Sequence, residues 1–134
     1  MAQSAAVRVA KTRAFGRWAD KQSLTDRQLC QAVDEMHRGL IDADLGGGLL
    51  KKRVARPGRG KSAGWRTVVA TDGAQEWIFV YGFAKNERDN IDDDELAVFK
   101  EWAKELLGLT DATRSRMVRD RSLEEVDCNA QEDA

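Results

Sequence analysis

The sequence predicts a protein of the α+β class, in which helices pack on a small antiparallel sheet. Three consecutive segments between Leu49 and Ala84 are rich in β-branched and aromatic residues, and no helical pattern interrupts them. Amphipathic helical patterns lie before and after this block. Consecutive strands without helices between them form an antiparallel meander. The chain has 134 residues, 42% hydrophobic and 34% charged, which is enough for one core.

The N-terminal third is expected to supply a strand and two helices. Alternation over Ala6–Thr12 favours a short strand at the N-terminus, and residues 13–21 indicate a first helix. Residues 23–40 form a clear amphipathic pattern, which Ser23 or Thr25 can cap. The apolar residues of this pattern are spaced by four, three and four positions: Leu29, Val33, Met36 and Leu40.

The centre of the chain changes to a period of two. Residues 42–48 contain three consecutive glycines, which end the preceding helix. The strands that follow are expected at Leu49–Ala55, Gly64–Thr71 and Glu76–Ala84. A tight turn at Asp72-Gly73 joins the last two, and a longer loop joins the first two.

The C-terminal part begins with a long helical pattern over Asn90–Leu109. Its acidic run at 92–95 suits a helix N-terminus, and Gly108 suits the end. Beyond Thr110 we expect one or two short helical turns, a capping box starting at Ser122, and disorder after residue 127. These patterns predict one domain over residues 1–109 and an extension over 110–134. The extension either packs as an extra helix or offers its arginines to RNA.

Charge is distributed unevenly, although the formal net charge is only −1. No acidic residue lies between Asp44 and Asp72, whereas the same interval contains seven basic residues: Lys51, Lys52, Arg53, Arg56, Arg59, Lys61 and Arg66. Acidic runs near residue 93 and at the C-terminus balance them. A basic segment of this size indicates a polyanionic partner.

The remaining composition indicates a cytoplasmic protein. Cys30 and Cys128 are far apart and lack metal-ligand spacing, so we expect free thiols in a reducing compartment. No apolar run reaches the roughly 18 residues of a membrane span, and the N-terminus lacks the apolar core of a signal peptide. We expect no metal and no other cofactor.

One motif invites a nucleotide-binding interpretation. The segment Ala55–Ser62 fits a relaxed phosphate-loop pattern ending in Gly-Lys-Ser. A true phosphate loop follows a strand and opens a helix, whose N-terminus holds the phosphates. Here the residues after Ser62 read as a strand, so the segment is predicted to be a hairpin loop that offers Arg59 and Lys61 to solvent.

The basic residues themselves favour binding to a nucleic-acid backbone. Alternation puts Lys51 and Arg53 on one surface of their strand, and Lys52 on the surface expected to meet the helices. If helices cover only the other surface, Lys51, Arg53 and Arg66 lie on an open one, where cations suit phosphate contacts. The single histidine, His37, lies within a helical pattern, so a mechanism based on two histidines is excluded.

Two stretches in sequence, "LLKKRVARPGRGKSAGWRTVVA" and "FVYGFAKNERDNI", resemble the RelE/ParE superfamily of bacterial toxins, closest to its HigB-like branch. The resemblance extends from about Lys11 to Leu109. It implies helices packed on a twisted antiparallel sheet, and a small antitoxin partner, often with a helix-turn-helix. Many members cleave messenger RNA on the ribosome, using the 2′-hydroxyl of the substrate; others inhibit DNA gyrase. An inactive binding module is a third alternative.

The resemblance also suggests site residues. Arg66 corresponds to a phosphate-stabilising arginine, Lys85 to a basic residue ending the last strand, and Lys51 and Arg53 to a first basic strand. Crowded lysines can serve as acid or base. The tyrosine that some members carry near the last helix has no counterpart, because Arg88 and Asn90 occupy that neighbourhood. The predicted catalytic set is Lys51, Arg53, Lys61, Arg66 and Lys85, and the predicted RNA-binding set is Lys52, Arg56, Arg59, Tyr81 and Arg88.

Overall fold

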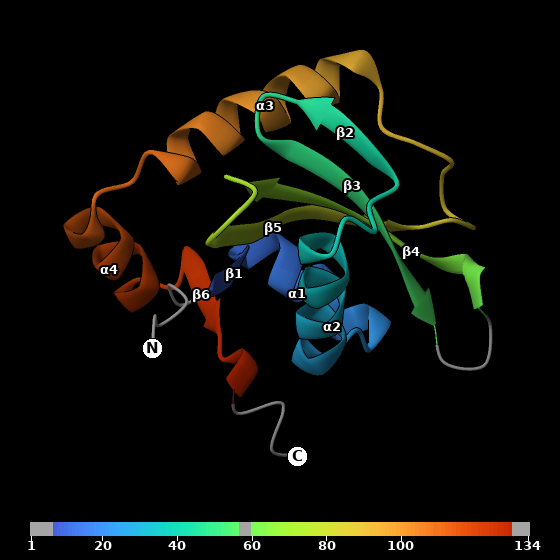
Figure 1. Ribbon diagram of the computed structural model, residues 1–134, viewed down its shortest axis with the longest axis horizontal. Coiled ribbons are helices and arrows are strands. Elements are labelled where there is room, and N and C mark those ends of the chain that lie inside the picture. The colour runs from blue at the N-terminus through green and yellow to red at the C-terminus, as the bar shows by residue number, and fades with distance from the viewer. Residues whose placement is uncertain (1–6, 57–59, 130–134) are drawn as a thin grey trace.

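The computed structural model describes residues 7–56 and 60–129, without the side chains of 60–63. These residues form four helices and six strands, and Figure 1 shows how they are arranged. In chain order the elements are β1 (Arg8–Thr12), α1 (Arg13–Gln22), α2 (Asp26–His37), β2 (Ala43–Gly46), β3 (Leu49–Arg56), β4 (Gly60–Thr71), β5 (Glu76–Ala84), α3 (Asp93–Leu107), α4 (Asp111–Arg119) and β6 (Leu123–Val126). The α+β class is confirmed.

The strands form one mixed sheet in the order β2-β3-β4-β5-β1-β6. The predicted antiparallel meander is confirmed as β3, β4 and β5. The N-terminal strand also exists, but it pairs parallel to β5, so the sheet is not purely antiparallel. The glycine-rich stretch adds a strand that the sequence did not predict: β2 ends at Gly46 and turns through three glycines with positive φ to pair with β3.

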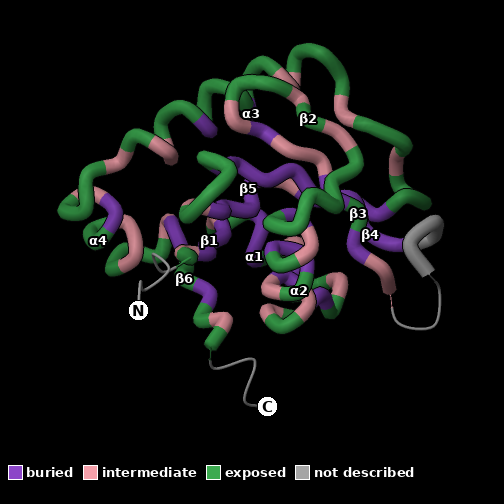
Figure 2. The backbone as a smooth tube through the Cα atoms, in the orientation of Figure 1, coloured by how far each residue is buried: buried purple, intermediate pink, exposed green. Residues whose placement is uncertain are grey.

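Helices cover both surfaces of the sheet. Helices α1 and α2 pack on one surface, where Phe15, Leu29, Trp65 and Phe79 are buried. Helix α3 crosses the other surface, where Phe99 packs against strand residues. Figure 2 shows that the buried residues concentrate in the central strands between these layers. The expectation of helices on one surface only is therefore incomplete, since α3 covers part of the surface that was expected to be open.

Capping residues fix where the two long helices begin. Thr25 caps α2, and its capping box with Gln28 confirms one of the two predicted caps. Asp92 caps α3 in the same way, with Glu95 as the second residue of the box. The backbone N–H of Asp92 donates to Glu95 Oε1 over 3.0 Å, and the N–H of Glu95 donates to Asp92 Oδ1 over 2.8 Å. The loop before α3 therefore enters the helix at a fixed position.

The chain after Leu109 continues into the same sheet. Helix α4 turns Arg114 inward, where its Nη1 lies 2.7 Å from Glu76 Oε1 of β5. The expected capping box at Ser122 is wrong, because residues 123–126 form strand β6 beside β1. Its first and last residues, Leu123 and Val126, are both buried, Leu123 in the cluster of Phe99 and Val126 in the cluster of Phe15. Disorder was expected after residue 127, but Cys128 is held by a disulfide and residue 129 is described as well; residues 130–134 lie outside the described part.

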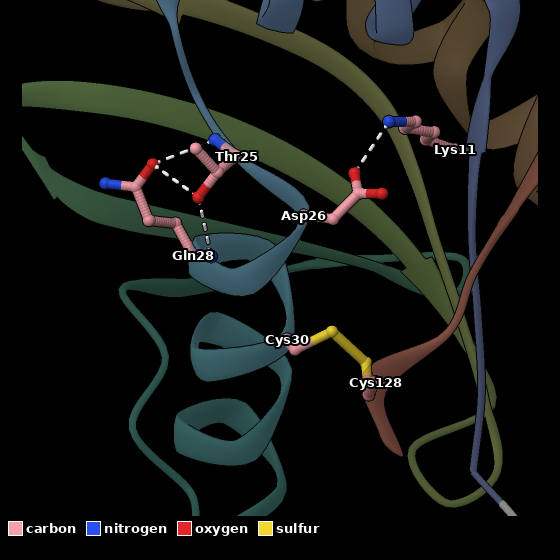
Figure 3. Close-up of a disulfide and its surroundings, with 6 residues drawn as sticks. All are labelled: Lys11, Thr25, Asp26, Gln28, Cys30 and Cys128. Atoms are coloured by element: carbon pink, nitrogen blue, oxygen red, sulfur yellow. Dashed lines mark hydrogen bonds and ion pairs between the residues drawn. A yellow bond between two sulfur atoms is a disulfide. The ribbon is translucent and has the colours of Figure 1, made fainter. Parts of the chain in front are cut away.

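The two cysteines form a disulfide, so the expectation of free thiols is wrong. The bond joins Cys30 of α2 to Cys128 just after β6, across 98 residues of chain (Figure 3). Sequence distance concealed this pairing, because Cys128 comes beside α2 only when β6 joins the sheet next to β1. Among the described residues, no helix is long and apolar enough to cross a membrane.

Candidate nucleic-acid interface

A surface on the α3 side of the sheet contains three of the basic residues of the meander. Lys51 pairs in register with Val68, which pairs with Tyr81; in the next row, Arg53 pairs with Arg66, which pairs with Phe83. Residues paired across a sheet point to the same side. Lys51, Arg53, Arg66 and Tyr81 therefore share one surface, which we call the cationic face.

A β-bulge in β5 brings Tyr81 onto this face. Between Val68 and Val69 the partner on β5 moves from Tyr81 to Phe79, so β5 contains one extra residue at this point. Strict alternation would put Tyr81 on the same side as Phe79, under α1 and α2. The bulge instead turns Gly82 toward α1, where a Cβ would lie 2.2 Å from the Trp18 ring. Only glycine fits there, so the bulge and the position of Tyr81 depend on each other.

A chain of hydrogen bonds connects the cationic face to the loop before α3. Lys51 Nζ donates to Asn90 Oδ1 over 3.2 Å, and Arg88 Nε donates to the Asn90 carbonyl over 2.9 Å. Arg88 Nη1 then donates to the Tyr81 hydroxyl over 3.0 Å and to Glu95 Oε2 over 2.8 Å. Strand β3, strand β5 and the start of α3 are thus held in one network.

Arg88 and Glu95 form the most strongly coupled pair in this network. Both Arg88 Nη atoms contact the Glu95 carboxylate, in the bidentate geometry that suits a planar guanidinium. The hydrogen bond from Arg88, together with the backbone N–H of Asp92, lowers the pKa of Glu95 to about 2. The same contact raises the pKa of Arg88 above its ordinary value. Both groups therefore stay charged across the physiological pH range.

The other catalytic candidates lie around this network. Arg66 is 4% exposed, at the centre of the face, while Arg53 is exposed and its Nε lies 3.4 Å from Asp42 Oδ1. Lys85 is exposed directly after β5. Lys61 lies in β4, but its side chain is outside the described part, as is Arg59. Of the predicted catalytic residues, the structure brings Lys51, Arg53 and Arg66 together on the neighbouring strands β3 and β4.

Two of the predicted RNA-binding residues lie on the opposite side. Lys52 is 3% exposed; its Nζ lies 2.7 Å from Glu35 Oε1 and donates to the Leu40 carbonyl. The predicted orientation of Lys52 toward the helices is confirmed. Arg56 stacks over the Trp65 ring at 5.4 Å, also on the α1–α2 side. The Lys52 contacts hold β3 to α2 and the segment after it, and the Arg56 contact joins β3 to β4, so neither residue belongs to the cationic face.

The segment that fits a phosphate loop does not open a helix. Backbone residues 60–71 form strand β4, which confirms the prediction of a strand after Gly-Lys-Ser. The prediction that the whole segment Ala55–Ser62 is a hairpin loop is wrong, because β3 continues to Arg56 and β4 already begins at Gly60. His37 ends α2, and its ring meets that of Trp77 on the side away from the cationic face. Within the described residues no cluster of histidine, cysteine, aspartate and glutamate could hold a metal ion.

Sequence reasoning missed the roles of Asn90 and Glu95. The acidic run before α3 was interpreted only as helix capping, although Glu95 also contacts Arg88. A signal was present in the spacing, since Arg88 and Glu95 flank a capping residue by four and three positions. The loop between the end of β5 at Ala84 and the start of α3 at Asp93 is short, so a residue of the loop and one in the first turn of the helix come close together.

Comparisons with known proteins agree with this arrangement. The chain matches the family described as the RelE toxin of the RelE/RelB toxin–antitoxin system, over residues 7–126. The match therefore includes α4 and β6 as well as the cationic face. No curated protein matches the chain. Because the family match covers nearly the whole chain, this protein belongs to the RelE toxin family.

Proposed function

We propose that the chain is the toxin of a type II toxin–antitoxin pair, of the HigB-like kind, and that it cleaves messenger RNA held in the ribosome. The observation that supports this most is the cationic face, where Lys51, Arg53 and Arg66 share a surface with Tyr81. Strands β3 to β5 contain one acidic residue, Glu76, at the far end of β5. Such a face suits an RNA backbone better than a protein partner.

The proposed reaction uses the 2′-hydroxyl of the RNA as nucleophile. Its oxygen forms a bond to the adjacent phosphorus while the bond from phosphorus to the 5′-oxygen breaks, leaving a 2′,3′-cyclic phosphate and a 5′-hydroxyl. Arg66 holds two phosphate oxygens and stabilises the charge of the transition state. Arg53, directly across from it, contacts the same or the neighbouring phosphate. Lys51 or Lys85, in its neutral form, accepts the proton of the 2′-hydroxyl.

The proposal extends to partners and compartment. We expect an antitoxin with a helix-turn-helix to hold the toxin inactive, and both proteins to act in the cytoplasm, where messenger RNA is translated. The Cys30–Cys128 disulfide does not enter the chemistry, because it lies on the α2 side of the sheet.

Induced expression with mapping of messenger RNA ends tests this function. We expect new 5′-hydroxyl ends within translated regions, and their loss in the Arg66→Lys variant at equal soluble expression. Intact messages together with inhibited gyrase supercoiling would instead identify a gyrase inhibitor. Intact messages with active gyrase would identify a binding module without an activity of its own.

A further inference from the structure

Tyr81 is the only tyrosine of the chain, and its side chain is held from three sides. Its ring stacks on Phe99 of α3 with a centroid distance of 4.9 Å, and the Phe83 ring lies 6.0 Å away along β5. Arg88 approaches its hydroxyl from the loop. Packing would hold only the ring, whereas here the hydroxyl oxygen is held as well.

The direction of the hydrogen bond determines what the hydroxyl can do. Arg88 has no acceptor, so it donates to the Tyr81 oxygen and leaves the phenolic hydrogen available for another group. Within the described part of the chain, no hydrogen bond uses that hydrogen.

Arg88 itself is too fully engaged to serve as a phosphate ligand. Its Nε donates to the Asn90 carbonyl, its Nη1 to Tyr81 and Glu95, and its Nη2 to Glu95. These bonds use four of the five N–H donors of a guanidinium. Glu95, which stays ionised because its pKa is lowered to about 2, is in turn fixed by the capping box of α3. The helix thus holds Glu95, Glu95 holds Arg88, and Arg88 holds Tyr81.

We propose that Tyr81 is the general acid of RNA cleavage, and that Arg88, held by Glu95, is the residue that positions it. This inference rests on the proposed endoribonuclease function. As the bond from phosphorus to the 5′-oxygen breaks, the Tyr81 proton passes to that oxygen, which leaves as a 5′-hydroxyl. Tyr81 becomes a phenolate beside Arg88 and regains a proton from water. Tyr81 thereby fills the role for which no tyrosine is present near the start of α3.

The decisive experiment removes the need for an acid. Ribosomes are programmed with a messenger RNA that carries either oxygen or a bridging sulfur at the 5′-position of the mapped cleavage site. With oxygen, Tyr81→Phe should slow single-turnover cleavage by about 10²–10⁴-fold. With sulfur, which leaves as a thiolate without protonation, the variant should cleave at nearly the wild-type rate. An equal loss on both substrates would overturn the role of acid and leave the endoribonuclease function standing.

Two further variants test the positioning role. Arg88→Lys keeps the charge but loses the bidentate contact, so we expect about a tenfold loss with oxygen and little loss with sulfur. Glu95→Gln should do the same without harming the helix, since Gln28 already forms the equivalent capping box in α2. Arg38→Lys serves as the matched control, because the exposed side chain of Arg38 contacts Asp34 of α2, over 3.1 Å, and in the part of the chain that the structure describes it makes no contact with the cationic face. Full activity of Arg88→Lys on the oxygen substrate would overturn the positioning role.

A measurement without RNA separates this inference from the proposed function. Because Tyr81 is the only tyrosine, ¹³C labelling of tyrosine at Cζ gives one resonance. That resonance should shift in Arg88→Lys and Glu95→Gln, but not in Arg38→Lys. A resonance that is unchanged in Arg88→Lys and Glu95→Gln would overturn the contact between Arg88 and the Tyr81 hydroxyl. A wild-type protein that cleaves neither substrate would overturn both the general-acid role of Tyr81 and the proposed endoribonuclease function. The tyrosine resonance would still show in that case whether Arg88 contacts Tyr81.

Discussion

Lys51 and Lys52 are neighbours in β3, yet they lie on opposite surfaces of the sheet. Lys52 is buried under α2 and neutralised by Glu35, whereas Lys51 lies on the cationic face and contacts the amide of Asn90. The same residue type thus stabilises the core on one side and remains accessible to a polyanion on the other. The difference arises from strand alternation and from the acid that α2 supplies.

Substitution of Lys52 should have the largest effect on stability. Lys52→Met removes this cation from Glu35, whose side chain is 16% exposed, and the loss should approach the roughly 3–5 kcal/mol that breaking a fully buried pair from one side costs. Urea unfolding measures the loss, and cleavage per folded molecule should not change. The double variant Lys52→Met with Glu35→Leu, which removes both charges, should recover much of the stability. A Lys52→Met variant that is stable but inactive would contradict the assignment of stability to the α2 side of the sheet and of RNA cleavage to the cationic face.

Substitution of Arg66 should have the opposite effect to that of Lys52: a loss of cleavage with little change in stability. Arg66→Lys keeps one positive charge on the cationic face but cannot hold two phosphate oxygens in a planar fork. We expect cleavage to fall by about 10²–10³-fold, the loss typical of one transition-state donor. Single-turnover rates on programmed ribosomes give the loss, and the melting temperature serves as the control. A large drop in melting temperature with unchanged rate would make Arg66, which is nearly buried, a structural residue instead.

The disulfide tests whether the α2 side can change without affecting the cationic face. Cys128→Ser releases the C-terminus from α2, and a crosslink across so long a loop stabilises by about 2–4 kcal/mol. Chemical denaturation should show this loss, and dithiothreitol should cause it in the wild type but not in the variant. RNA cleavage at a temperature where both proteins stay folded should be equal. Unequal cleavage would show that the two sides of the sheet are coupled.

The sequence predicted most of the elements because local signals were sufficient for them. Strands β3 to β5 alternate between clear turn residues, and α2 and α3 carry capping residues that fix their starts. Elements that depend on distant partners were missed. Strand β6 has only four residues and becomes a strand because β1 offers an edge, and the disulfide follows from that pairing.

The candidate site was predictable in its charges and not in its arrangement. Alternation alone separated Lys51 and Arg53 from Lys52. The bulge turns Tyr81 toward the cationic face and Gly82 toward Trp18, which packs on it from another element. The contact of Arg88 with Glu95 depends on how the loop folds back over β5. Neither follows from the periodicity of one strand.

The smallest effect is expected for the substitution of Lys51, which compares this lysine directly with its neighbour Lys52 on the other surface of the sheet. About four phosphate contacts predict that the logarithm of RNA affinity falls with the logarithm of salt at a slope near −3. Lys51→Met should reduce that slope by about 0.7, the value of one contact with single-stranded RNA, while stability changes by less than about 0.5 kcal/mol. Titration of labelled RNA at several salt concentrations measures the slope, with Arg38→Met as a surface control of equal charge loss. An unchanged slope would remove Lys51 from the RNA-binding surface and leave Arg53 and Arg66 as its basis, since a cation that meets no phosphate releases no counterion.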